Sequence, residues 1–278
     1  RYKFRLNEKT LGIIGVGRIG SIVAAWARLL GMKVLLCDPP LSRRSSEAFV
    51  DCLTLAREAD IVTFHVPLTL EGPDRTFDLI DEKWFSALKT GAFLINTSRG
   101  EIIREEALLT AIQAKHVAAA VLDVWRNEPM IDPSAVAAAE IATPHIAGYS
   151  VEAKRRAVWM IRDSLIQFMR GVNLAVADQS RAAPMHGIIA VDVTSAPNHS
   201  TQELLHWIVK GVCDLSNVDT RLRELLRRSP RNDSGGFEAA RAPSNLRREF
   251  ESHEVVLRGG GSLSANLLGQ LGFRVIPR

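Results

Sequence analysis

Three glycines in the spacing Gly15-x-Gly17-x-x-Gly20 lie between an apolar run and a stretch of helical periodicity. Where a strand turns into a helix, the first glycine permits a tight turn and the second lets a pyrophosphate approach the backbone. The third lets the helix pack closely on the strand, and the helix N-terminus, with Arg18 and Ile19, faces the phosphates. A bare glycine motif also occurs in unrelated α/β turns, but here both flanking elements are predicted. The motif therefore predicts the nucleotide-binding turn of a Rossmann fold.

The pattern from residue 10 to residue 145 alternates short apolar runs with helical stretches. The apolar runs are nearly continuous, as expected of strands that are buried on both faces of a parallel sheet. This alternation predicts an α/β fold with a doubly wound parallel sheet. Strands are expected at 11–16, 33–38, 61–66, 92–97, 118–125 and 141–145, with helices at 19–30, 53–58, 81–88, 105–115 and 134–139.

We expect two domains joined by a helix in a chain of 278 residues. Residues 1–150 are predicted to form the nucleotide-binding Rossmann domain, and residues 151–172 a long amphipathic linking helix. Residues 173–278 are predicted to form a small α+β domain, with strands at 187–193 and 252–257 and helices at 202–226 and 263–272. The chain begins with Arg1 rather than Met and reaches its first strand near residue 11. We therefore expect a truncated N-terminus.

The composition excludes several classes of partner. The formal net charge of +4 is too small for a nucleic-acid-binding protein, which needs a concentrated basic face. The three cysteines, Cys37, Cys52 and Cys213, are widely spaced, which favours neither a disulfide framework nor a metal site. No apolar run is as long as a membrane span, and no secretory signal is present. A cytoplasmic protein without metal, nucleic acid or membrane partners is expected.

Asp38 closes the second predicted strand, about 20 residues beyond the glycine motif. A carboxylate at this position accepts hydrogen bonds from the adenosine ribose hydroxyls and repels a 2′-phosphate. Its presence favours NAD over NADP as the cofactor. Arg43 and Arg44 lie close by in the sequence and are contrary evidence, which we interpret as a solvated loop.

Arg99, Glu128 and His145 follow the fourth, fifth and sixth predicted strands. In open α/β sheets the chemistry takes place beyond the carboxyl ends of the strands. Arg99 is suited to bind a carboxylate through paired hydrogen bonds, and His145 is a candidate general acid or base. Glu128 would orient the imidazole and favour its protonated form. Asp123 ends the fifth strand, where it would contact the nicotinamide carboxamide or simply cap the strand end.

The run from about residue 10 to residue 150 resembles the D-isomer-specific 2-hydroxyacid dehydrogenases. The shared motifs are Gly15–Gly20, His65-Val66-Pro67-Leu68, Asn96–Gly100, Leu122-Asp123-Val124 with Glu128-Pro129, and Pro144-His145. Segments 36–40, 71–73, 121–125 and 141–149 are similar to one branch of that family, which oxidises 4-phospho-D-erythronate in vitamin B6 biosynthesis. The C-terminal segment is also similar to the dimerisation domain of that branch, more loosely between about 172 and 246.

This resemblance implies a function and a set of site residues. It implies NAD-dependent oxidation of a phosphorylated 2-hydroxy acid, 4-phospho-D-erythronate, by a homodimer formed through residues 173–278. The helix at 151–172 would then belong to a substrate domain that is mostly absent. The resemblance implies Arg99, Glu128 and His145 as active-site residues, with His145 as the proton donor, and Arg99 and Tyr149 at the substrate. The residues implied around NAD are Asp38, Val66, Ser98, Arg99, Asp123 and Gly148; Val66 stands where relatives often carry threonine.

Two other hypotheses remain open at this point. The first is a dehydrogenase for another D-2-hydroxy acid, against which Tyr149 and the C-terminal segment argue. The second is an NAD-binding dimeric module that lacks turnover because of the expected truncation. The presence of Arg99, Glu128 and His145 argues against the second hypothesis.

Overall fold

The computed structural model describes residues 4–171, 191–192, 200–228, 234–241, 248–257 and 262–277. Its internal contacts divide the chain into two units. The first contains Arg1–Ile146 and Leu215–Ala242, and the second contains Ala147–Asp214 and Pro243–Arg278. The predicted strand at 187–193 lies outside the described residues except for 191–192.

The first unit is built on a six-stranded sheet in which every neighbouring pair of strands is parallel. The strand order is β2-β1-β3-β4-β5-β6, so the direction of winding reverses after β2 and the chain proceeds to the opposite edge. This order confirms the predicted α/β fold with a doubly wound parallel sheet. The strands are β1 (Thr10–Ile14), β2 (Lys33–Cys37), β3 (Ile61–Phe64), β4 (Ala92–Asn96), β5 (Val117–Leu122) and β6 (Ile141–Ala142).

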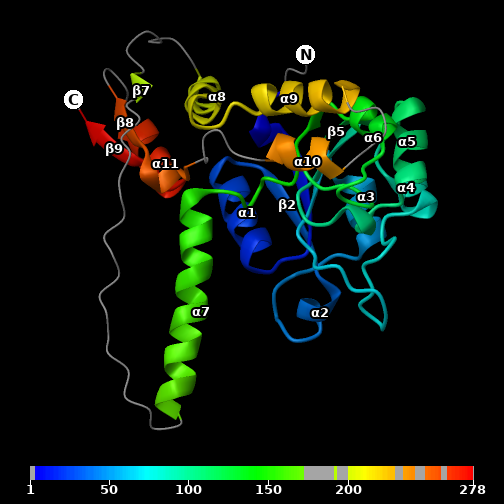
Figure 1. Cartoon of the computed structure of the whole chain (residues 1–278), viewed down its shortest axis with the longest axis horizontal. Coiled ribbons are helices and arrows are strands. Elements are labelled where there is room, and N and C mark those ends of the chain that lie inside the picture. Colours follow the sequence, from blue (N-terminus) through cyan, green and yellow to red (C-terminus); the bar gives the residue numbers. More distant parts are fainter. Residues whose placement is uncertain are drawn as a thin grey trace. The chain divides into compact units, whose positions relative to one another are not determined.

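Two hydrophobic clusters explain the continuous apolar strands. Ile13 is buried in a cluster with Ala24 and Ala27, whereas the adjacent Ile14 is buried in a second cluster with Leu55. Because successive side chains of a strand point to opposite faces, both faces of β1 are covered and neither tolerates polar residues. The covering helices are α1 (Arg18–Leu29), α2 (Pro39–Ser42), α3 (Cys52–Glu58), α4 (Glu82–Ala87), α5 (Glu105–Gln113) and α6 (Pro133–Ala138), of which Figure 1 shows α1 on one side and α3 to α5 on the other.

The predicted single helix at 202–226 is wrong, because the chain forms two helices there. These are α8 (Thr201–Val212) in the second unit and α9 (Leu215–Arg228) in the first. The chain leaves helical geometry at Cys213, with φ −143° and ψ 97°. α8 buries Ile208, whereas α9 buries Leu222 in the core beneath the sheet. One straight helix cannot direct its apolar stripe into two separate units, so the helix is interrupted.

The helices α9 and α10 (Ser234–Arg241) pack on the first unit. This segment was predicted to belong to a domain of residues 173–278, whereas in the structure it belongs to the unit that contains the six-stranded sheet. Leu222, Phe237 and Ala240 join the same hydrophobic cluster as the residues of α3 to α6. Figure 1 shows α9 and α10 beside α6 and β5. Apolar residues on an amphipathic helix indicate that one face is buried, but not which element covers it. The packing of α9 and α10 on the first unit was therefore not predicted.

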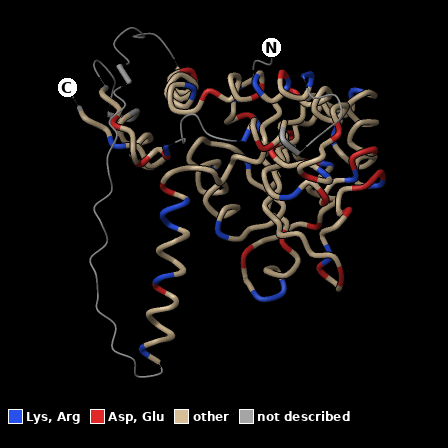
Figure 2. The backbone as a smooth tube through the Cα atoms, in the orientation of Figure 1, with Lys and Arg blue, Asp and Glu red and all other residues tan. Residues whose placement is uncertain are grey.

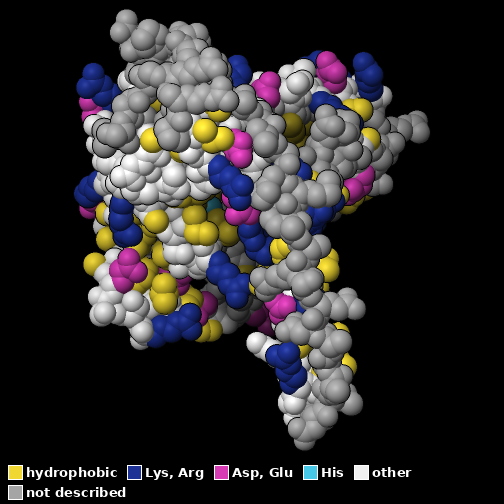
Figure 3. Space-filling view, turned by 90° about the vertical axis from the view of Figure 1, so that its left-hand side faces the viewer, with side chains coloured by type: hydrophobic (Ala, Val, Ile, Leu, Met, Phe, Trp, Pro, Cys, Tyr) yellow, Lys and Arg dark blue, Asp and Glu magenta, His cyan; other side chains and the backbone are white. Residues whose placement is uncertain are grey.

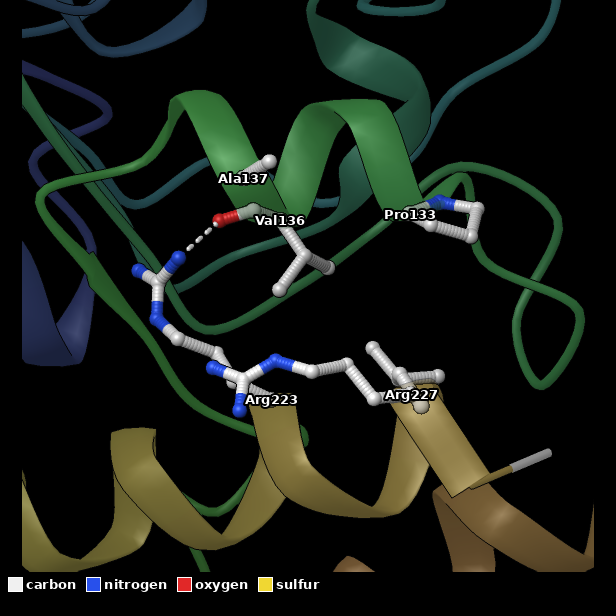
Figure 4. A pocket seen from close by; sticks show the side chains of 6 residues that line it. Pro133, Val136, Ala137, Arg223 and Arg227 are labelled. Atoms are coloured by element: carbon white, nitrogen blue, oxygen red, sulfur yellow. Dashed lines mark hydrogen bonds between the residues drawn. The ribbon is translucent and has the colours of Figure 1, made fainter. Parts of the chain in front are cut away.

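Asp219 and Arg223, a charged pair on α9, attach this helix to the edge of the sheet. Asp219 Oδ1 accepts a hydrogen bond of 2.8 Å from the backbone N–H of Ala142 in β6. Arg223 Nε donates to both carboxylate oxygens of Asp219 at 2.9 Å. The other guanidinium nitrogens donate to the carbonyls of Val136 at 2.7 Å and Ala139 at 2.8 Å, the former drawn in Figure 4. Arg223 therefore caps the carbonyl end of α6, where a positive charge is favourable.

The second unit contains the long helix α7 (Val151–Gly171) and a small α+β region. The helix agrees with the predicted one at 151–172 to within one residue at its end. Three parallel strands follow the order β7-β8-β9, spanning Val191–Asp192, Glu254–Leu257 and Arg274–Pro277, with α11 (Ser262–Gln270) before the last. Glu152 of α7 accepts hydrogen bonds from Arg248 Nε at 2.7 Å and Ser252 Oγ at 2.5 Å. These contacts attach α7 to the segment that leads into β8.

Charged side chains are distributed over both units. Lys and Arg recur along the length of α7 in Figure 2. On the face drawn in Figure 3, basic side chains are spread among acidic and hydrophobic ones. Within the described part of the chain, no helix combines the length and the apolar character that crossing a membrane requires.

We expect Arg223→Met to lower the free energy of unfolding by about 2 kcal/mol, because it removes charge-assisted hydrogen bonds to Asp219 and to the end of α6. Chemical denaturation of both proteins measures the change. Arg227→Met is the matched control, because Arg227 is exposed on the same helix. Arg223 and Arg227 also line one cavity of about 350 Å³ between α6 and α9. The control should change stability by less than about 0.5 kcal/mol. Equal losses in both variants would contradict the role given to Arg223.

Candidate functional site

The glycine turn connects β1 to α1, and the surroundings of its three glycines differ. Gly15 has a φ of +91°, and a Cβ there would lie 2.7 Å from the backbone carbonyl of His65. A Cβ on Gly20 would lie 2.0 Å from the carbonyl oxygen of Gly15, so only glycine fits. A Cβ on Gly17 would meet nothing within 4 Å. The backbone at Gly17 is thus open, next to the N–H groups at the start of α1, as a bound pyrophosphate requires.

The end of β2 positions this turn. Cys37 accepts a hydrogen bond of 2.8 Å at its carbonyl oxygen from the N–H of Gly15. Asp38 accepts at Oδ2 from the N–H of Val16 at 2.8 Å, and at Oδ1 from the N–H of Leu41 at 2.9 Å, which caps α2. This bracing role of Asp38 was not predicted from the sequence. A carboxylate has about four acceptor sites, so Asp38 retains capacity for ribose hydroxyls.

The two arginines after Asp38 belong to exposed chain. Arg43, whose side chain is exposed, donates to the half-buried Asp74 at 2.5 Å. Arg44 is exposed as well. The guanidinium of Arg43 is therefore already paired with a carboxylate, which agrees with the interpretation of these residues as a solvated loop.

The ends of β4, β5 and β6 are in register, because Asn96 pairs with Leu122 and Leu122 pairs with Ala142. The turn after β4 is shaped by the buried Asn96, whose Nδ2 donates to the carbonyl of Arg99 at 2.9 Å. Its Oδ1 accepts from the N–H of Ser98 at 3.1 Å and from the Ser98 hydroxyl at 2.9 Å. The exposed Arg99 guanidinium donates to the Ser98 carbonyl at 2.6 Å. Asn96 belongs to the motif Asn96–Gly100 that the sequence shows, but its role in shaping the turn was not predicted; a polar residue within an apolar strand was the available signal.

Glu128 and His145 come together beyond the ends of β5 and β6. Glu128 Oε2 and His145 Nδ1 are 2.7 Å apart, and Glu128 Oε1 accepts from the N–H of Trp125 at 2.8 Å. His145 has a φ of +54°, and its backbone N–H donates to the carbonyl of Asp123 at 2.7 Å. The hydrogen bond to Glu128 raises the pKa of His145, although partial burial opposes the shift. This leaves Nε2 as the ring nitrogen that can exchange a proton with a reactant.

Asp123 is buried and braces the segment that carries His145. Its Oδ1 accepts from the hydroxyl of Thr143 at 2.5 Å and from the N–H of Ile146 at 2.8 Å. Trp125 donates from Nε1 to the carbonyl of Thr143 at 2.9 Å. These contacts give Asp123 the role of a cap, and its contact with a nicotinamide stays a prediction. Thr143 and Trp125 were not identified as site residues; a buried threonine at a strand end was the available signal.

The remaining predicted residues lie in two places. Arg18 and Ile19 are exposed at the start of α1. Val66 lies close to the glycine turn, because a Cβ on Gly15 would come within 2.8 Å of a methyl group of Val66. Gly148 and Tyr149 belong to the second unit, where the Lys154 ammonium lies 3.7 Å from the centroid of the Tyr149 ring. Across the described ranges, no group of His, Cys, Asp and Glu side chains is arranged to hold a metal ion.

The sequence profile described as "D-isomer specific 2-hydroxyacid dehydrogenase, NAD binding domain" matches residues 1–147. The erythronate-4-phosphate dehydrogenase of Aeromonas salmonicida is 38% identical over 282 residues, covering 100% of this chain and 71% of the relative. The protein of the same name from Salinibacter ruber is 38% identical over 256 residues, covering 90% of this chain and 65% of the relative. The chain therefore spans about two thirds of the length of these relatives.

A solved structure provides a comparison of the fold. The D-lactate dehydrogenase of Aquifex aeolicus, complexed with NAD and lactic acid, aligns with a TM-score of 0.52 and 30% identity. The alignment covers 61% of this chain and 56% of that protein. The segment matched by the profile, residues 1–147, contains the glycine turn, Arg99 and the Glu128–His145 pair, and it is an NAD-binding domain.

We expect the imidazole of His145 to titrate above about 6.5, because Glu128 stabilises its protonated form. A raised pKa in the folded state means that this contact stabilises the protein below the pKa of the unfolded chain. The stabilisation is lost as the pH rises through the folded-state pKa. NMR titration of the histidine ring signals in the folded and in the unfolded protein measures the pKa of His145 in each state. The variant His145→Gln assigns the signal.

Glu128→Gln removes the acceptor charge and should return the pKa of His145 towards about 6.5. His65 is an internal reference, since its burial lowers its pKa and it should titrate below that value in both proteins. An unchanged His145 titration in Glu128→Gln would show that the carboxylate does not control the ring.

Proposed function

The chain belongs to the D-isomer-specific 2-hydroxyacid dehydrogenase family, and we propose that it catalyses the NAD-dependent oxidation of 4-phospho-D-erythronate. The product is 2-oxo-3-hydroxy-4-phosphobutanoate, on the route to pyridoxal 5′-phosphate (vitamin B6). The observation that carries this proposal is the extent of the likeness to relatives named erythronate-4-phosphate dehydrogenase. It continues beyond the NAD-binding domain through the C-terminal part of the chain, at 38% identity.

The proposed catalytic residues are Arg99, Glu128 and His145. NAD, when bound, accepts the hydride that leaves C2 of the 2-hydroxy acid. His145 removes the hydroxyl proton at Nε2, and Glu128 stabilises the imidazolium that results, which its 2.7 Å contact supports. Arg99 binds the carboxylate and the reacting oxygen, for which its exposed guanidinium is suited. The resemblance adds Tyr149 at the substrate.

The proposed cofactor contacts follow the open side of the glycine turn and the strand ends. Gly17 and the start of α1 bind the pyrophosphate, and Asp38 binds the adenosine ribose. The bracing of Val16 by Asp38 supports this assignment, because it places the carboxylate beside the turn. The full proposed set is Gly15, Gly17, Arg18, Ile19, Gly20, Asp38, Val66, Ser98, Arg99, Asp123 and Gly148.

We also propose a homodimer formed through residues 173–278, in a reducing cytoplasm. The resemblance of the C-terminal segment to a dimerisation domain supports the first, and the small number and wide spacing of the cysteines support the second. Light scattering should give twice the chain mass of 30.6 kDa. A single-chain mass at high protein concentration would contradict the dimer.

The substrate is tested by measuring NADH formation with a panel of acids. The panel contains 4-phospho-D-erythronate, D-erythronate without the phosphate, D-lactate and D-3-phosphoglycerate. The assay uses this chain and a version extended upstream to the length of the relatives. We expect kcat/KM for the phosphorylated four-carbon acid to exceed every other by at least about tenfold. A higher value for another acid supports a different D-2-hydroxy acid, and NAD binding without turnover in both versions supports a non-catalytic module.

His145→Asn in whichever version is active should lower kcat by at least about a hundredfold, because it removes the proton acceptor. His116→Asn is a control, since His116 contacts the Leu88 carbonyl and has no assigned part in the reaction. NAD affinity, measured by calorimetry, should stay similar in both variants. A near-normal rate in His145→Asn would remove this residue from the proposed mechanism.

A further inference from the structure

The turns that follow β4 and β5 pack directly against each other. In the first turn Gly100 follows Arg99, and the second turn leads to Glu128. A Cβ on Gly100 would lie 2.0 Å from the carbonyl carbon of Trp125 and 2.5 Å from the backbone nitrogen of Arg126. Only glycine leaves room for that peptide, so the backbone beside Arg99 touches the turn that leads to Glu128.

A third segment, between β3 and α4, is bound to the chain that follows β4. The N–H of Asp78 donates to the carbonyl of Glu101 at 2.9 Å. The N–H of Ile80 donates in the same way to the carbonyl of Ile102 at 3.0 Å. Asp78 has a φ of +52°, a left-handed conformation that Asp and Asn adopt more readily than most residues. Asp78 is therefore fixed relative to the turn that carries Arg99.

The side chain of Arg126 reaches this third segment. Arg126 Nη2 and Asp78 Oδ1 form an ion pair, and the two side chains are only 19% and 17% exposed. The guanidinium carbon also lies 5.1 Å from the centroid of the Phe77 ring, within the range of a cation–π contact. Solvent and salt screen exposed ion pairs strongly but screen a partly buried pair much less. Arg126 is thus held by its backbone against Gly100 and by its side chain against Asp78.

Arg126 and Glu128 belong to the same turn. Glu128 Oε1 accepts a hydrogen bond of 2.8 Å from the N–H of Trp125, the residue before Arg126. The other carboxylate oxygen, Oε2, is 2.7 Å from His145 Nδ1. Hydrogen bonds weaken steeply with distance and angle. A displacement of this turn would therefore weaken the contact between Glu128 and His145.

We propose that Asp78 and Arg126 are positioning residues for the Glu128–His145 pair. Their ion pair ties the turn of Glu128 to the segment that is bound beside Arg99, and it thereby keeps the Glu128 carboxylate in contact with the imidazole. Neither residue binds substrate or cofactor in the proposed reaction, and both act through Glu128. The consequence for turnover rests on the proposed function, whereas the effect on the Glu128–His145 contact does not.

A positioning role and a direct charge effect predict different signs. The charged groups that act most on the pKa of His145 are Glu128, Asp123 and Arg241 of α10. If Arg126 acted through its charge alone, its removal would raise the pKa of His145, and removal of the Asp78 charge would lower it. If the ion pair positions Glu128, loss of either partner weakens the carboxylate–imidazole contact and lowers the pKa of His145.

The positioning role is tested by NMR titration of His145 in the full chain and its variants. We expect Arg126→Met to lower the proton affinity of His145 at least about threefold, a pKa decrease of about 0.5. Arg126→Gln repeats this test with a polar side chain. Asp78→Asn should lower the pKa as well, because Asn tolerates the left-handed backbone but carries no charge. Arg126→Lys keeps a charge that can pair with Asp78, so its His145 pKa should stay closer to that of the unaltered chain.

Arg104→Met is the matched control. Arg104 also pairs with Asp78, at 3.8 Å, but it is not part of the turn that carries Glu128. Its replacement should leave the pKa of His145 unchanged. A rise or no change of this pKa in Arg126→Met overturns the proposal, as does an equal fall in Arg104→Met. If Arg126→Met does not fold, Arg126→Gln and Asp78→Asn decide the test by the same criteria.

The consequence for turnover is measured with the acid that the enzyme oxidises. We expect Arg126→Met to lower kcat at least about tenfold, because a displaced Glu128 stabilises the imidazolium less. KM for the acid, and the NAD affinity measured by calorimetry, should change by less than about twofold, which separates displacement from loss of binding. A lower kcat with an unchanged His145 pKa overturns the role through Glu128. Absence of turnover with every acid contradicts the proposed function, while the NMR titration still decides the positioning role.

Discussion

The parallel register of the sheet is the constraint on which the site depends. Because all six strands run in one direction, their carboxyl ends meet at one edge. Asn96, Leu122 and Ala142 are aligned there, and the chain leaves each of these strands in a short turn. Arg99, Glu128 and His145 are far apart in the sequence, yet each follows one of three adjacent strand ends. The topology of the sheet by itself therefore brings these three residues to the same edge.

Buried polar groups then convert this edge into a defined geometry. Asn96 shapes the turn that carries Arg99, and Asp123 ties the segment after β6 to the end of β5. Asp38 does the same for the glycine turn. A buried polar group that lost its partner would cost about 1–3 kcal/mol, so each of these turns is strongly held in one conformation.

Much of the fold and of the candidate site was predictable from local patterns. The glycine spacing, the continuous apolar runs and the polar residues after them specified the sheet, and Glu128 and His145 meet as expected. The interruption at Cys213 was not predictable, because both α8 and α9 have amphipathic patterns of their own. Helical periodicity reveals an apolar stripe but not the core that will cover it. The docking of Asp219 and Arg223 against β6 and α6 was hidden for the same reason.

The sequence by itself determined the fold class, the position of the nucleotide turn and the identity of the residues at the strand ends. These depend on periodicity and backbone conformation, which are local properties. Only the tertiary structure decided that Asp38 braces Val16 and that Asn96 and Thr143 support the site. These are contacts between residues that are distant along the chain or lie on different elements. They arise when packing brings the elements together, and no local pattern encodes them.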